Sequence, residues 1–397
     1  MVLVWTLPTQ SPRLRNVPEI PLNTLPRPFC AFSLGKPNVS GLSPSKGHEN
    51  YDGVLDALVL PLLRHFHGRL QAMSCLTINI PVFNHNEETL SNMSFIVQSV
   101  PSIRELGLQL NRPSPEDMSH FTCSLTHLTR LYVRDTTVEC VWYLLQRCPN
   151  LQTALFTLGS TLEPRRWSEN TYDVCCNHLH TLSISYDQCY DREDPDEGDD
   201  VSNDSGDSDD YLVSSPFLDF ISLPNLTNMT IGTAWSDDPY YHADPDLCYF
   251  TPLATRNSAG IQALTLDKFP AAAFEMEKLY HQLPNLRYLD IIEARWTDHG
   301  SVIKNYTVES RFLDAMKHTS IFPKLEELRL YVNHDWEGSS AFEEMVERRR
   351  FKNMYLEIRN RSVDNLDLPR LRELVAKGQM VTVKCESAIE GKLYTLV

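Results

Sequence analysis

The sequence predicts an α/β solenoid of irregular repeats, curved like a horseshoe, with a parallel sheet on its concave face and helices on its convex face. Two observations support this prediction. A short pattern (an apolar residue, two variable residues, an apolar residue, one variable residue and an apolar residue) recurs along the 397-residue chain. Segments whose apolar residues have helical spacing lie between its copies, so strands and helices alternate.

The pattern occurs ten times, and five of its nine spacings fall in the 20–29 residues of a leucine-rich repeat. Five copies directly follow Pro-Asn, Pro-Ser or Pro-Lys, where proline ends any preceding helix. A closed parallel α/β barrel is the alternative, but it needs more even units. The copies begin at Met73, Ile103, Leu128, Leu151, Leu179, Leu226, Ile261, Leu286, Leu325 and Phe351.

The copy LRYLDI shows why this spacing suits a strand. Alternate residues of an extended segment point to opposite faces, so Leu289 and Ile291 point inward while Tyr288 and Asp290 point outward. Leu286 lies at the bend before the strand and also turns inward. One such strand cannot bury its apolar face alone, so the repeats must stack side by side.

Helix signals lie between the strands. Ser114 is placed to cap a helix that has Pro115 at its first position. The segment 138–148, VECVWYLLQRC, carries an apolar stripe. In 340–350, Ser340 and Glu343 have the spacing of a capping box.

The ends of the last two helices are also predicted. We interpret Arg348–Arg350 as complementing the helix dipole, in preference to a nuclear-localisation signal. Gly378 follows PRLRELVAK and suits the position just after a helix end.

The chain divides into three predicted parts. Residues 1–50 contain eight prolines, which predicts a poorly ordered segment. The solenoid is expected over 51–386, and a short tail over 387–397. No apolar run is long enough to span a membrane, and the start has no basic leader, so we expect an intracellular chain, cytoplasmic or nuclear.

The region from about Leu62 to Cys385 resembles the fungal F-box/leucine-rich-repeat proteins. The repeats of the CPNLxxLxL kind and the stretch LLRHFHGRLQAMSCLTINIP carry the resemblance. It implies a substrate receptor of an SCF-type ubiquitin ligase, in which an F-box of three helices binds the adaptor and the repeats hold the substrate. Neighbouring prolines in 1–50 are at most nine residues apart, so no F-box is recognisable there. The alternative is a free-standing structural or regulatory scaffold without a ligase link.

The net charge of −16 comes mostly from one segment. Twelve acidic residues and one arginine lie between Asp187 and Asp210, which leaves a net charge of −5 on the remainder. We expect 190–210 to be a solvated, disordered loop. The functional alternative is recruitment of a basic partner, or phosphorylation at Ser205 or Ser208. Neither part of the chain suits nucleic-acid binding.

A second insertion, 233–250, is rich in aromatic and acidic residues. It can be a binding loop on a rigid scaffold, or its aromatic side chains can fold back over the solenoid. The sequence leaves both readings open.

No metal, cofactor or catalytic site is predicted. A group of cysteines and histidines near residue 178 lacks the paired Cys-x₂-Cys spacing of structural zinc sites. No G-x-S-x-G, Walker, H-E-x-x-H or G-x-G-x-x-G motif occurs, so an enzyme is not expected. The members of the group are Cys175, Cys176, His178, His180 and Cys189.

The concave face is the predicted protein-binding surface. Its side chains come from the variable positions of the strands, and tyrosine and arginine are the types enriched at interface hot spots. We expect a monomer that binds protein partners there and binds neither membranes nor nucleic acid. The candidate binding residues are Arg130, Tyr132, Arg134, Tyr288, Asp290, Arg329 and Tyr331.

Overall fold

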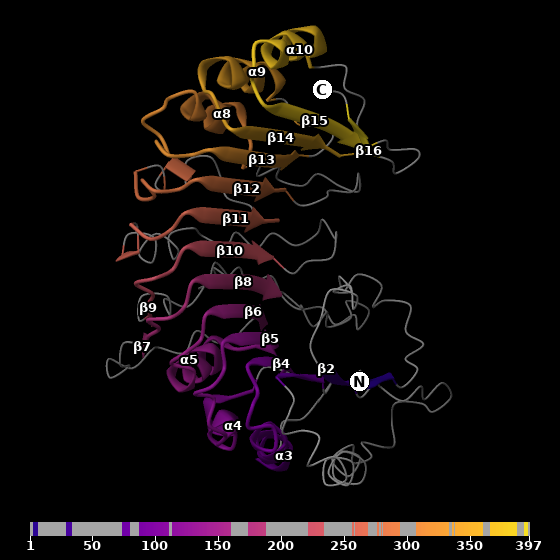
Figure 1. The fold of residues 1–397 in the computed structure, drawn as a ribbon, viewed down its shortest axis with the longest axis vertical. Helices are drawn as coiled ribbons and strands as arrows, with labels where there is room; N and C mark the ends of the chain where they lie inside the picture. Colours follow the sequence, from indigo (N-terminus) through magenta and orange to yellow (C-terminus); the bar gives the residue numbers. More distant parts are fainter. Residues whose placement is uncertain are drawn as a thin grey trace, which may run out of the picture. The chain divides into compact units, whose positions relative to one another are not determined.

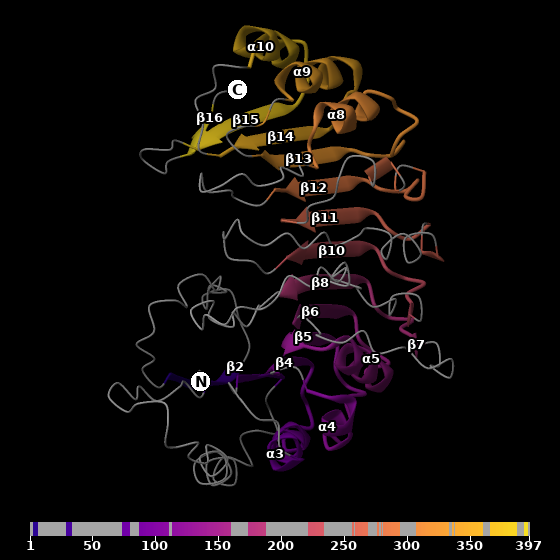
Figure 2. The same ribbon diagram turned by 180° about the vertical axis from the view of Figure 1, so that it is seen from behind.

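A computed structural model gives the fold, and Figures 1 and 2 show its helices and strands. These elements belong to two compact units. Unit 1 comprises Met1–Gly159 with Cys176–Leu179, and unit 2 comprises Ser160–Cys175 with His180–Val397. The structure describes residues 3–6, 29–33, 74–79, 87–110, 113–159, 174–187, 221–233, 256–257, 259–268, 276–277, 279, 281–293, 307–332, 336, 338–359, 366–386 and 393–395.

Unit 1 contains a sheet in which each described strand pairs in parallel with the next one in sequence. Three described helices alternate with its strands: α3 (Glu87–Gln98), α4 (Pro115–Ser119) and α5 (Val138–Arg147). The strands are β1 (Leu3–Thr6), β2 (Phe29–Ser33), β3 (Cys75–Asn79), β4 (Glu105–Gln109), β5 (Arg130–Thr136) and β6 (Thr153–Gly159).

Unit 2 repeats this arrangement, with described helices α8 (Ser310–Met316), α9 (Ser339–Arg348) and α10 (Leu368–Ala376). Its strands pair in parallel up to β15, and β16 adds an antiparallel edge. A separate parallel pair joins β7 (Val174–Cys175) to β9 (Ile221–Ser222). The strands of the main sheet are β8 (Thr181–Asp187), β10 (Asn228–Thr233), β11 (Ala263–Asp267), β12 (Tyr288–Ile292), β13 (Glu327–Val332), β14 (Asn353–Ile358), β15 (Val381–Glu386) and β16 (Leu393–Thr395).

The repeat pattern is confirmed at all ten copies, because a strand begins two residues after the start of each one. Leu289 and Ile291 of β12 are buried, and Tyr288 is exposed, as the alternation predicts. Leu286 at the bend is fully buried. The fold is therefore the predicted α/β leucine-rich-repeat solenoid. That one continuous solenoid covers 51–386 stays a prediction.

Backbone hydrogen bonds explain the bend before each strand. The carbonyl of Arg104 accepts from the amides of both Thr129 and Arg130 in the next repeat, and the same pairing recurs through both units. The asparagine of Pro-Asn-Leu adds a side-chain bond to the preceding repeat. Asn150 Nδ2 donates to the carbonyl of Thr126 at 2.7 Å, and Asn285 does the same to Ala259 at 2.9 Å.

The helix signals in unit 1 are confirmed. The Ser114 hydroxyl accepts from the amide of Asp117, whose carboxylate accepts from the amide of Ser114 in return, which is a complete capping box. Helix α5 begins after Thr137, whose hydroxyl accepts from the amide of Cys140. Its apolar stripe is buried.

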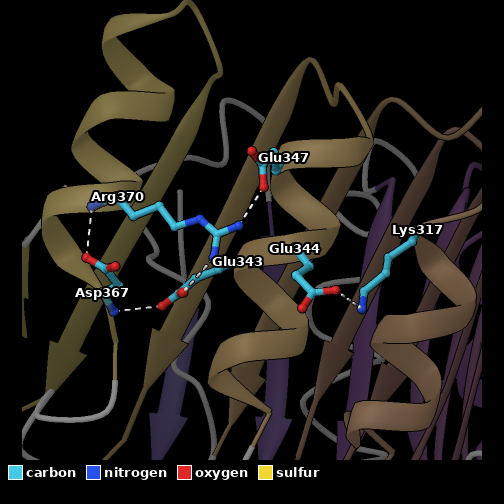
Figure 3. A network of polar contacts seen from close by, with 6 residues as sticks. All are labelled: Lys317, Glu343, Glu344, Glu347, Asp367 and Arg370. Carbon is cyan, nitrogen blue, oxygen red and sulfur yellow. Dashed lines mark hydrogen bonds and ion pairs between the residues drawn. The ribbon is translucent and has the colours of Figure 1, made fainter.

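The predicted capping box at the start of α9 is wrong. Gly338 is the N-cap, and α9 has no side-chain cap. Glu343 is instead buried, and its carboxylate accepts from the backbone amide of Asp367 at 2.6 Å (Figure 3). Arg370 of α10 completes the connection, since it contacts Glu343 at 3.6 Å and Glu347 at 2.5 Å. The spacing does not mark a helix start here because this glutamate joins α9 to α10.

A lysine joins the preceding pair of helices. Lys317 follows α8 and binds Glu344 of α9 at 2.7 Å (Figure 3), and it also contacts Asp314. Helices α8, α9 and α10 thus lie side by side with charged contacts between each neighbouring pair. Gly378 follows α10 with φ of 92°, which confirms the predicted glycine at that helix end.

The interpretation of Arg348–Arg350 needs correction. Arg348 does lie in the last turn of α9. Arg349, however, is only 4% exposed and turns away to α8. It donates to the carbonyls of Met316, His318, Ile321 and Phe322. The middle residue of the basic run is therefore a buried cap for the end of another helix.

Strands β1 and β2 lie inside residues 1–50, where the sequence predicts a poorly ordered segment. Prolines up to nine residues apart exclude long helices but leave room for strands of four or five residues. Leu3–Thr6 precedes Pro8, and Phe29–Ser33 fits between Pro28 and Pro37. Strand β16 likewise lies in the predicted tail 387–397.

The two predicted insertions fall on residues that the structure does not describe. The acidic segment 190–210 lies outside the described residues, as does 234–250 of the aromatic and acidic insertion. Among the described residues, no helix is both long enough and apolar enough to cross a membrane.

Candidate protein-binding face

The seven predicted residues all lie on strands, at positions that alternate with buried apolar residues. We call the side of each sheet formed by these alternate positions the open face. Three of the residues belong to unit 1 and four to unit 2, so they form two separate groups.

The group in unit 1 lies on β5. Arg130 pairs with Glu105 of β4 at 3.5 Å, and Arg134 is exposed. Tyr132 is half-buried, and its pKa is raised by burial and by the Glu105 carboxylate. Gly107 lies opposite Tyr132 in the sheet, and a Cβ there would lie 3.0 Å from the Thr77 side chain. The absence of a side chain at Gly107 therefore leaves almost no free space on the face, because the Thr77 side chain already occupies it.

The group in unit 2 joins β12 to β13. Arg329 Nε lies 3.9 Å from Asp290, and its Nη2 lies 3.4 Å from Glu327. The Arg329 side chain is 49% exposed. Exposed pairs at these distances contribute little to stability, so Arg329 is available to a partner. Tyr288 is 41% exposed on the same face.

Two tyrosines form the centre of this face. The rings of Tyr331 on β13 and Tyr355 on β14 are 5.4 Å apart and tilted by 47°. The Tyr355 hydroxyl donates to Glu357 at 2.6 Å, and Lys384 Nζ lies 5.3 Å from the centre of the Tyr355 ring. Tyr355, Glu357 and Lys384 are not among the predicted site residues.

Arg359 also contacts Tyr331. Its guanidinium lies 5.4 Å from the centre of the Tyr331 ring, and its Nε is 3.7 Å from Glu357. Its Nη1 donates to the backbone carbonyl of Glu293 at 3.0 Å. With these contacts made, Arg359 is only 9% exposed. It orders the face and is not itself a contact for a partner.

The missed residues have a signal in the sequence. Continuing the alternation of the copy that begins at Phe351 places Asn353, Tyr355 and Glu357 on the open face. The segment VTVKCE, which forms β15, also alternates and places Lys384 there.

Burial raises the pKa of four side chains on the open face of unit 2. It raises the pKa of Asp267 and of Asp290, because each carboxylate is partly withdrawn from water. Burial also raises the pKa of Tyr331 and Tyr355, and for Tyr355 the hydrogen bond to Glu357 acts in the same direction. Both hydroxyls therefore stay protonated at neutral pH.

The described residues offer no group of three or more metal-binding side chains. Of the cysteine and histidine group, Cys176 is buried, and His180 Nδ1 lies 3.1 Å from the carbonyl oxygen of Asn225. Cys189 lies outside the described residues. Burial raises the pKa of Cys123 to about 11 and of Cys140 to about 12, which keeps both as unreactive thiols.

Comparison with known proteins gives the fold little independent support. No protein-family model and no curated protein matches the chain. Among solved structures, it is similar to a chain in the crystal structure of the TLR13–ssRNA13 complex, with 13% identity and a TM-score of 0.32. The match covers 76% of this chain and 44% of that one. The fold assignment rests on the strand register and the burial described above.

Proposed function

We propose that this chain is a non-enzymatic protein-recognition scaffold that binds its partner on the open face. The observation that carries the proposal is the ordered set of tyrosine, arginine and aspartate side chains that β12, β13 and β14 present in register. These side chains sit on a hydrogen-bonded parallel sheet. Binding to such a face therefore costs little conformational entropy, which favours recognition.

The sites of contact are the seven residues on the two open faces. In unit 1 they are Arg130, Tyr132 and Arg134. In unit 2 they are Tyr288, Asp290, Arg329 and Tyr331. Tyrosine and arginine combine a large contact area with directional hydrogen bonds, which supports their place in the proposal.

Photo-crosslinking tests the proposed face. A photoreactive amino acid replaces Tyr288 on the open face or, as the control, Lys377 directly after α10, where the side chain is 64% exposed. We expect covalent adducts with one protein from position 288 in cells that express the full chain, and none from position 377. Adducts from position 377 alone contradict the proposal.

The more specific role is that of a substrate receptor in an SCF-type ubiquitin ligase, which the F-box/leucine-rich-repeat resemblance implies. Its test is binding of the purified full-length chain to the adaptor–cullin complex. Saturable binding supports this role. No binding, together with crosslinks from position 288, supports the free-standing scaffold that the prolines of 1–50 favour.

The proposed location is inside the cell, in the cytoplasm or the nucleus. Buried thiols such as Cys140 and Cys148 support it, because the thiol form is the one expected in a reducing compartment. Recovery of the chain from the secreted fraction of expressing cells contradicts this location.

A further inference from the structure

The open face of unit 2 carries an excess of acid. On strands β11 to β15, the positions that alternate with buried apolar residues form the open face. Together with Arg359, which directly follows β14, these positions hold five acidic and three basic side chains. The acids are Asp267, Asp290, Glu327, Glu357 and Glu386, and the bases are Arg329, Arg359 and Lys384.

Two of the three bases on this face, Arg359 and Lys384, are engaged within the unit. Arg359 is buried against Tyr331 and donates to a backbone carbonyl, and Lys384 lies over the Tyr355 ring. Arg329 is shared between Glu327 and Asp290. The basic side chains therefore compensate little of the negative charge of the acidic side chains at the β11 side of the face.

Asp267 shows the imbalance most directly. It ends β11 and is partly buried. Among the described residues, no lysine, arginine or histidine nitrogen lies within 4.0 Å of its carboxylate, the distance that defines an ion pair. Lys268 and Arg359 act on it only from a longer range. Asp290 contacts Arg329 at 3.9 Å. A carboxylate partly removed from water attracts an incoming cation more strongly than an exposed one does.

We propose that the open face of β11–β13 docks a basic, extended segment of a partner protein, with arginine or lysine side chains at Asp267 and Asp290. This inference rests on the proposed function and names the chemistry of the partner. Tyr288, two residues before Asp290 and exposed on the same face, adds a ring against which a cation can pack.

The spacing of the two carboxylates fits such a segment. Thr265 lies opposite Asp290, so Asp267 is the diagonal neighbour of Asp290 on the adjacent strand. Strand separation and rise per residue place these two positions about 8 Å apart. In an extended segment, residues i and i+2 point the same way and are about 7 Å apart. Two basic residues separated by one other residue can therefore reach both aspartates.

A labelled peptide tests the inference. The probe is an alternating glycine–arginine peptide of about eight residues, longer than the roughly three residues that cross β11 to β13. Its binding to the full-length chain is measured by fluorescence anisotropy at about 0.15 M salt, where distant charges are screened. We expect saturable binding that Asp267→Asn with Asp290→Asn weakens at least about tenfold. An alternating glycine–glutamate peptide should not bind.

The matched control removes the same charge from the acidic segment. Asp209→Asn with Asp210→Asn should change the affinity less than about twofold, because the inference depends on the face and not on net charge. The inference is overturned if the arginine peptide does not bind, if both double variants weaken binding equally, or if the face variant binds as well as the parent chain. Thermal unfolding of both variants checks that the fold is retained.

The two experiments distinguish failure of the proposed function from failure of this inference. Crosslinks from position 288 to a partner, combined with unchanged partner binding by the Asp267→Asn/Asp290→Asn variant, keep the open face as the docking site and refute a basic partner. Peptide binding that depends on both aspartates, without crosslinks from position 288 in cells, supports the basic-segment chemistry and contradicts the proposed protein-docking role.

Discussion

The guanidinium of Arg349 donates to the backbone carbonyl of Phe322 at 2.5 Å, although Arg349 lies at the end of α9 and Phe322 lies in the loop after α8. Phe322 is fully buried, and its φ of 43° is a conformation that a bulky side chain rarely adopts. Because the same guanidinium also binds the carbonyl of Met316, which ends α8, and those of His318 and Ile321 in the loop, Arg349 holds the strained turn that leads into β13.

Removing this arginine should destabilise unit 2. We expect Arg349→Ala to lower the free energy of unfolding by about 2–4 kcal/mol, since several buried carbonyls lose a donor and the guanidinium leaves a cavity. Chemical denaturation with urea measures the loss. The control is Arg348→Ala, an exposed neighbour whose replacement should stay within about 0.5 kcal/mol. Equal effects of the two replacements would show that the buried contacts are not stabilising.

The strand register gives a second prediction. Leu289→Asp places a charge at a fully buried position of β12, so we expect a loss of more than about 3 kcal/mol. Asp290→Asn, one residue further on the open face, should leave the unfolding midpoint nearly unchanged. Circular dichroism melts of both variants decide the matter. A Leu289→Asp variant as stable as the parent chain would refute the register.

The ten pattern copies are enough to predict ten strands, because each copy has alternating apolar positions that only stacking can bury, and five copies also follow a proline that ends any preceding helix. Leu286, Leu289 and Ile291 illustrate this: one helix stop and one alternation determine which side chains are buried. The same alternation predicts Tyr288 and Asp290 on the opposite side of the strand, and both lie there on the open face.

What the sequence does not predict depends on partners far along the chain. Arg349 resembles any basic residue at a helix end, and only the packing of α8 against α9 gives it four carbonyls. Arg359 and Glu293 are 66 residues apart, and no local pattern links them. Short strands such as β1 and β2 lack the repeat signature and form by pairing with a neighbour in the sheet.

The buried cysteines give a prediction about reactivity. Cys123, Cys140 and Cys148 are almost inaccessible, and burial raises the pKa of each thiol. Because the thiolate is the reactive form, iodoacetamide at about pH 8 should leave all three unmodified in the folded chain and modify them after denaturation. Mass spectrometry of peptides from both samples measures this. Rapid modification of Cys140 in the folded chain would contradict its burial.

The tyrosine pair predicts how stability changes at alkaline pH. In the folded chain the pKa of Tyr355 is raised by burial and by Glu357, whereas an unfolded tyrosine ionises near pH 10. Above about pH 10 the unfolded state therefore releases a proton that the folded state keeps, and stability falls as pH rises. The Tyr355→Phe variant has no hydroxyl to ionise at this position, so it does not lose this part of the stability as pH rises. The difference in free energy of unfolding between the parent chain and the variant should therefore shrink between about pH 9 and about pH 11. Urea denaturation across this range measures the deficit, with Tyr288→Phe as the exposed control. A deficit that stays constant with pH would mean that the hydrogen bond from Tyr355 to Glu357 does not hold the proton.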